Sequence, residues 1–150
     1  MNPDKKSVFC STVIPNAVRI SIANAIILHE AYFDILGENG KEPSGRIADA
    51  IVKYYGSFEN WMKHFTSLGL AARGWVVLAY DFNEGRLRNY IADAHNLYGI
   101  WGAAPIIVLD VYEHAYFIDF GSDRPAYIKA FWDNLDWAKV NSIYLKAKSK

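Results

Sequence analysis

The sequence is poor in the features that mark secreted and membrane proteins. Cys10 is the single cysteine in 150 residues, which excludes a disulfide within the chain and is typical of a reducing compartment, so we expect a cytoplasmic protein. No apolar run approaches the roughly 18 residues of a membrane span. Residues 5–14 are too polar, and lack the small-residue cleavage site, for a signal peptide. We therefore expect no association with a membrane.

The chain also has no formal net charge at pH 7. Sixteen basic residues balance sixteen acidic ones, so there is no global electrostatic reason to expect nucleic acid or an anionic surface as a partner. Hydrophobic residues make up 52% of the chain and aromatic residues 15%, which is ample for a packed core and argues against disorder. The length fits one domain, or one domain with a small helical segment.

The first half of the chain has the periodicity of helices. Apolar residues at helical spacing predict a helix from Asn16 to a stop at Gly37, and residues 38–43 then form a loop that is the best internal boundary. The apolar residues at this spacing are Ile20, Ala23, Ile27, Ala31 and Ile35.

Two more helices follow, each introduced by a serine. We predict that Ser44 caps a helix that runs to Tyr55, and that Ser57 caps the next, which ends near Gly74.

After Gly74 the pattern changes to that of strands. Residues 75–80 and 86–92 are rich in strand-forming residues and flank the turn 83–85, which predicts a hairpin. The apolar run ending at residue 110 predicts a third, buried strand over 105–110.

Two helices close the chain, the first opening at Asp123 and running toward residue 135, the second capped by Asp136 and running to 147. Helices, three clustered strands and further helices predict an α+β fold with a three-stranded antiparallel sheet flanked by helices. We expect residues 1–40 to form an N-terminal helical segment and residues 41–150 a C-terminal domain.

A carboxylate and an imidazole lie four residues apart where the third strand ends. Asp110 and His114 together suit a transition metal of intermediate softness better than calcium or magnesium, which prefer all-oxygen ligands. The spacing alone favours a buried Asp–His hydrogen bond without a metal.

The full string around these residues is more specific. Residues 110–120 resemble the DVWEHAYYLDY signature of the iron/manganese superoxide dismutases, in which the Asp and the His bind the metal. The resemblance covers residues 19–144 in the family's order. Residues 56–61, 73–78 and 127–137 resemble its GSF, GSGW and YIKAFWNVINW segments, and residues 27–33 resemble a helix that carries another metal-binding histidine.

This resemblance implies a metal-dependent enzyme that converts superoxide to oxygen and hydrogen peroxide. It implies iron or manganese as the cofactor and His29, Asp110 and His114 as ligands. A lone histidine on an apolar helix face is otherwise more often a core residue. The resemblance, together with the partners that the strand 105–110 supplies, favours His29 as a ligand.

The family uses one further histidine, on a helix ahead of the one that carries His29. Only 28 residues precede His29 here, and none is histidine. Three readings remain open: a superoxide dismutase impaired by the missing ligand, a catalytically degenerate member that serves as a structural or assembly subunit, and a chain whose natural form carries the missing helix.

The resemblance also assigns residues around the metal. His95 corresponds to the residue that hydrogen-bonds metal-bound solvent, although a loop histidine in solvent is the alternative. Trp75 and Tyr112 correspond to the apolar wall of the active site. Glu113 corresponds to a residue at the interface of a homodimer. His64 has the setting of a helix-surface residue and is given no function.

Overall fold

The computed structural model describes residues 16–37, 42–97 and 101–150. Cys10 and the polar segment 5–14 lie outside these ranges. None of the described helices combines the length and the hydropathy that crossing a bilayer requires. The elements are α1 (Asn16–Asp34), α2 (Arg46–Tyr55), α3 (Phe58–Ala71), β1 (Trp75–Asp81), β2 (Arg86–Ala92), β3 (Ala103–Asp110), the 3-10 helix η1 (Glu113–Ala115), α4 (Phe117–Phe120), α5 (Arg124–Asp133) and α6 (Trp137–Lys148).

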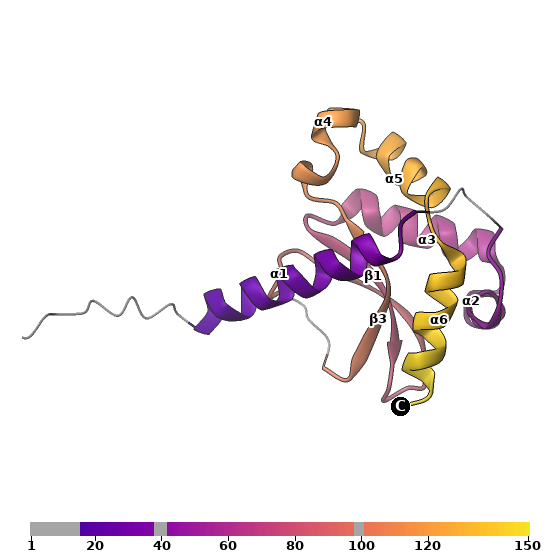
Figure 1. The fold of residues 1–150 in the computed structure, drawn as a ribbon. Coiled ribbons are helices and arrows are strands. Elements are labelled where there is room, and N and C mark those ends of the chain that lie inside the picture. The colour runs from indigo at the N-terminus through magenta and orange to yellow at the C-terminus, as the bar shows by residue number, and fades with distance from the viewer. Residues whose placement is uncertain (1–15, 38–41, 98–100) are drawn as a thin grey trace, which may run out of the picture.

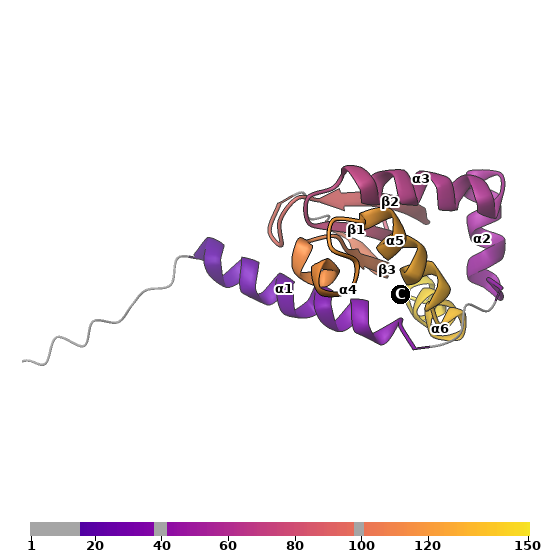
Figure 2. The same ribbon diagram turned by 90° about the horizontal axis from the view of Figure 1, so that it is seen from above.

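The three strands form one antiparallel sheet in the order β2-β1-β3, which confirms the predicted α+β fold. Figure 1 shows α1 crossing the sheet region, and in Figure 2 α1 and α3 lie on opposite sides of the strands. β1 is mostly buried, and so is β3 from Ile106 to Asp110, as expected of apolar strands covered by helices. The strand bounds predicted from the sequence agree with the observed ones for β2, and they differ by one residue for β1 and by two for β3.

The register of the sheet places the predicted site at one end of it. Trp75, the first residue of β1, pairs with Asp110, the last residue of β3. Farther along, Ala79 pairs with Pro105 and the register shifts between Leu78 and Ala79. Proline has no N–H to donate, so a bulge on this edge strand is where it is tolerated.

The predicted N-cap at Ser57 is confirmed, because its hydroxyl accepts the N–H of Asn60 at 3.1 Å. Asp136 caps α6 in the same way, accepting from the N–H groups of Ala138 and Lys139. The α3 helix ends at Ala71, three residues before the predicted stop at Gly74.

The predicted cap at Ser44 is wrong. Gly45 occupies the N-cap position of α2, with a φ of 80°, and gives no side-chain hydrogen bond. The N–H of Ile47 instead donates to Oδ1 of Asn141 on α6, at 3.1 Å. A Cβ at position 45 would lie 2.7 Å from the Asn141 side chain, so glycine allows the close approach of α6 that supplies this cap.

Helix α1 is confirmed, but its buried face is narrower than its apolar spacing indicated. Tyr32 and Ile35 are buried in the core and Leu28 packs against it, whereas Ile20 and Ile27 are exposed. The C-terminal ends of α1 and α5 meet through a β-bridge between Leu36 and Leu135. Because Leu135 makes this bridge, α5 ends at Asp133 instead of continuing to residue 135.

Candidate metal centre

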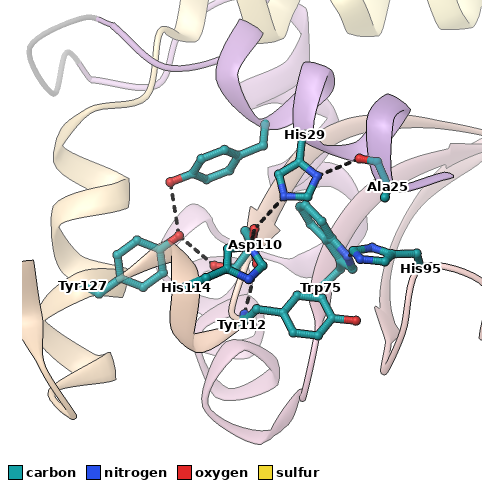
Figure 3. Close-up of polar contacts among 9 residues, drawn as sticks. Ala25, His29, Trp75, His95, Asp110, Tyr112, His114 and Tyr127 are labelled. Carbon is teal, nitrogen blue, oxygen red and sulfur yellow. Dashed lines mark hydrogen bonds and ion pairs between the residues drawn. The ribbon is translucent and has the colours of Figure 1, made fainter. Parts of the chain in front are cut away.

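Three potential ligands from distant parts of the chain converge at the end of the sheet. His29 comes from α1, Asp110 from the end of β3 and His114 from η1, and one donor atom of each lies within 4.8 Å of the others. Oδ2 of Asp110 lies 3.4 Å from Nε2 of His29 and 3.1 Å from Nε2 of His114 (Figure 3). All three sequence-predicted ligands are therefore brought together.

The backbone of α1 orients the His29 ring. Its Nδ1 lies 2.7 Å from the carbonyl oxygen of Ala25, one turn earlier. A carbonyl can only accept, so Nδ1 carries the hydrogen and donates it, which leaves the lone pair of Nε2 directed at Asp110. A ligand histidine held through its other nitrogen is the usual arrangement in metal sites.

Asp110 is the buried member of the centre, with 1% of its surface exposed. Its Oδ1 accepts the N–H of Tyr112 at 3.0 Å, so Oδ2 remains for the two histidines. Burial raises the pKa of Asp110, and the Tyr112 N–H and the two histidines counteract this only in part. A buried carboxylate with a raised pKa is stabilised in its charged form by a nearby cation.

Two tyrosines hold the backbone of Asp110 in place. The hydroxyl of Tyr127 on α5 donates to the Asp110 carbonyl oxygen at 2.6 Å, and it lies 3.1 Å from the hydroxyl of Tyr32 on α1. This chain, visible in Figure 3, joins three separate elements behind the carboxylate. No sequence pattern predicted this chain, because residues so far apart carry no local sign that they will share hydrogen bonds.

His114 forms the open side of the centre. Its side chain is exposed, and its ring stacks at 5.4 Å on that of Tyr112 and at 5.8 Å on that of His29. A cavity of about 590 Å³ opens beside it. The residues that line it are Ala71, Ala72, Arg73, Val111, Tyr112, Glu113, His114 and Arg124. A small molecule in this cavity reaches His114 without crossing the core.

Trp75 and His95 form the wall behind His29. Trp75 is fully buried, and its ring meets that of His29 edge-on at 4.9 Å. Its indole N–H donates to Nδ1 of His95 at 3.0 Å, so in the neutral His95 ring the hydrogen lies on Nε2. Burial lowers the pKa of His95, and the nearby His29 lowers it further. This favours the neutral ring.

His95 is therefore fixed against the centre and is half-buried, unlike a loop histidine in solvent. Its ring lies 6.0 Å from that of His29 and 5.2 Å from that of Tyr112. The side-chain amide of Asn24 on α1 donates to the His95 carbonyl oxygen at 2.7 Å. This hydrogen bond connects the segment that carries His95 to α1, the helix that carries His29. No sequence pattern pointed to Asn24.

Two other residues fall outside the centre. Glu113 is exposed beside His114, and within the described ranges it makes no ion pair. His64 is exposed on α3, where its Nδ1 lies 2.9 Å from the Asn89 amide. Its surface position agrees with the absence of any assigned function.

The donor set fits iron or manganese. Two imidazole nitrogens and one carboxylate oxygen are of intermediate softness, and the same combination serves other non-haem iron sites. Calcium and magnesium favour all-oxygen shells, and the residues 16–37, 42–97 and 101–150 include no cysteine that could add a thiolate. The convergence of three donors on one point, with one of them a buried carboxylate, is what a metal cation requires.

Comparisons with known proteins point to one family. The sequence model of the iron/manganese superoxide dismutases, C-terminal domain, matches residues 43–143. The chain is 42% identical to a protein named superoxide dismutase [Mn] 1 from Halobacterium salinarum, over 83% of this chain and 62% of that protein. It is 41% identical to superoxide dismutase [Fe] from Aquifex aeolicus, over 81% of this chain and 58% of the relative.

A third relative, superoxide dismutase [Fe] from Cupriavidus metallidurans, is 39% identical over 83% of this chain and 64% of its own length. The chain thus spans about three fifths of the length of the curated relatives that it matches.

Proposed function

The chain belongs to the iron/manganese superoxide dismutase family, and on this premise we propose that it converts superoxide to oxygen and hydrogen peroxide with one bound iron or manganese ion. The observation that carries the proposal is the convergence of His29, Asp110 and His114. The family resemblance read from the sequence is confirmed by the match to residues 43–143.

The metal ion would supply the capacity to accept one electron from a superoxide and return one to the next. The protein supplies the rest. His29 and His114 would bind through Nε2, and Asp110 would add the negative charge that balances the cation. Hydrogen peroxide formation consumes two protons for each pair of superoxide ions. His95, with its hydrogen held on Nε2 by the Trp75 contact, is the residue placed to deliver a proton toward the centre.

The alternative of a structural subunit without catalysis is less well supported. A scaffold has no need for a buried carboxylate with two imidazoles directed at one of its oxygens. The choice between iron and manganese stays open within the proposal, because relatives of nearly equal identity carry either metal in their names.

Substitutions of His95 test its role in catalysis separately from metal binding. We expect His95→Ala to lower superoxide consumption per bound metal by about tenfold to a hundredfold, the usual effect of removing a residue that supports a metal site. His95→Gln, which keeps an amide N–H in a similar place, should retain most of the activity. Pulse radiolysis measures the rates, and elemental analysis gives the metal content of each variant.

His64→Ala is the matched control, since it removes an imidazole outside the centre. Equal rates for wild type and His95→Ala would remove His95 from the mechanism. A wild-type protein that binds metal but consumes no superoxide would favour the structural subunit.

We also propose a homodimer with Glu113 at the interface, near His114 of the partner subunit. Glu113 is exposed beside the centre, and two apolar residues close by in the chain are exposed as well, Phe117 by 61% and Ile118 by 93%. Large exposed apolar side chains near one another favour an interface. Sedimentation velocity at micromolar concentration should give the dimer mass, and Ile118→Lys should shift it to the monomer. A monomer for the wild type would contradict the proposal.

Two further proposals rest on the sequence. A cytoplasmic location is supported by the single cysteine, Cys10. The division into an N-terminal helical segment (1–40) and a C-terminal domain (41–150) is supported by the family match, which begins at residue 43.

A further inference from the structure

A second cavity lies away from the metal centre, between α2 and α6, which Figure 1 shows next to one another. Its volume is about 410 Å³, within the range of pockets that hold small molecules. The residues that line it are Arg46, Asp49, Ala50, Lys53, Tyr54, Tyr144 and Lys148. None of these residues belongs to the metal centre, and nothing in the proposed dismutase reaction uses them.

The cavity has an excess of positive charge. Three cations, Arg46, Lys53 and Lys148, line it against one carboxylate, Asp49. In the described part of the chain none of the three cations forms an ion pair, although exposed lysines elsewhere do, such as Lys129 with Asp133. The ammonium groups of Lys53 and Lys148 lie 5.3 and 6.0 Å from the rings of Tyr54 and Tyr144.

A tyrosine hydroxyl adds a donor to this charge. The Tyr144 residue is only 3% exposed and lines the cavity, and its hydroxyl, which is itself accessible, has no hydrogen-bond partner among the residues that the structure describes. Burial raises the pKa of Tyr144, with smaller contributions from Tyr54 and Tyr80, and Arg46 opposes the shift. The hydroxyl therefore keeps its proton at neutral pH, close to Tyr54 and Arg46, which also line the cavity.

We propose that this cavity binds a phosphate group, either as free phosphate or as the monoester of a small molecule. At pH 7 a phosphate monoester carries a charge of about −1.5 to −2 and three strong acceptor oxygens. The lining residues offer a matching net charge and the donors that such a group needs: the guanidinium fork of Arg46, two ammonium groups and the Tyr144 hydroxyl. The remaining space beside the Tyr54 ring would accommodate an organic substituent.

The test is isothermal titration calorimetry on the 150-residue chain with inorganic phosphate and with phenyl phosphate, at constant ionic strength because exposed charges are screened by salt. We expect saturable binding of at least one of the two. Tighter binding of phenyl phosphate would assign the site to a monoester, and equal binding would assign it to free phosphate.

Two lysines in the last turn of α6 provide a matched pair of variants. Lys148 lines the cavity and Lys146 does not, so Lys148→Gln and Lys146→Gln remove the same charge from the same turn. Lys148→Gln should raise the Kd about tenfold, the equivalent of 1.4 kcal/mol, and Lys146→Gln should leave it unchanged. Tyr144→Phe, which keeps the packed ring, should also weaken binding.

Equal effects of the two lysine variants would show attraction by general surface charge and would overturn the proposal. So would the absence of saturable binding of either ligand at millimolar concentration. The measurement involves no superoxide chemistry, so its outcome is independent of the proposed enzymatic function.

Discussion

Asp110→Asn is expected to lower the bound iron or manganese from about one ion per chain to less than about a tenth of that. Residues that merely support ligands contribute 10- to 100-fold in metal affinity, and a direct ligand should contribute more. Asparagine preserves the volume of the side chain and an oxygen that can accept the Tyr112 N–H. The substitution therefore removes the charge at Oδ2 and leaves the local packing in place. Elemental analysis after gel filtration gives the metal content.

His114→Ala should show the same loss, since its Nε2 lies 3.1 Å from the same oxygen. His114 is exposed, so this variant is expected to fold normally, which circular dichroism would verify. His64→Ala, an exposed histidine on α3, should leave the metal content unchanged. Unchanged metal in both Asp110→Asn and His114→Ala would eliminate the proposed centre.

The second large effect concerns catalysis by the 150-residue chain itself. The resemblance implies a centre with three histidines and one aspartate, but the 150 residues contain no histidine before His29. A centre with one imidazole fewer admits more water and has a shifted redox potential. Each tenfold loss in rate requires only about 1.4 kcal/mol of barrier. We therefore expect superoxide consumption per bound metal to be at least about tenfold slower than in a full-length relative.

Free imidazole provides a direct test of this explanation. If the deficit comes from a missing ligand, millimolar imidazole should raise the rate measured by pulse radiolysis, as should a fused N-terminal helix that carries a histidine. The metal with imidazole but without protein is the control. If the 150-residue chain without imidazole is as fast as a relative, three ligands suffice here and this account of the centre is wrong.

The local elements were predictable because short-range rules govern them. Runs of apolar and strand-forming residues, two of them flanking a turn, located the three strands. The caps at Ser57 and Asp136 follow from side chains that bond to the next turn of their own helix. The predicted cap of α2 at Ser44 was wrong for the opposite reason. Its acceptor, Asn141, comes from a helix more than ninety residues away, and no property of Ser44 or its neighbours reveals that.

The identity of the three ligands could be read from the sequence, since residues 110–120 match a family signature and residues 27–33 match a second segment. Whether the three side chains lie close enough to bind one metal ion depends on the tertiary structure. Only the packing of α1 along β3 brings His29 to within 3.4 Å of the Asp110 carboxylate.

The sequence by itself determined the fold class, most element boundaries and which residues could bind a metal, because helix and strand periodicity and residue chemistry are local properties. Tertiary structure alone determined the burial of Asp110, the hydrogen on Nδ1 of His29 and the contact of Trp75 with His95. It also determined the positively charged cavity between α2 and α6. A pKa, a ring orientation and a cavity each depend on which distant side chains displace water around a group, and the chain sets this only when it packs.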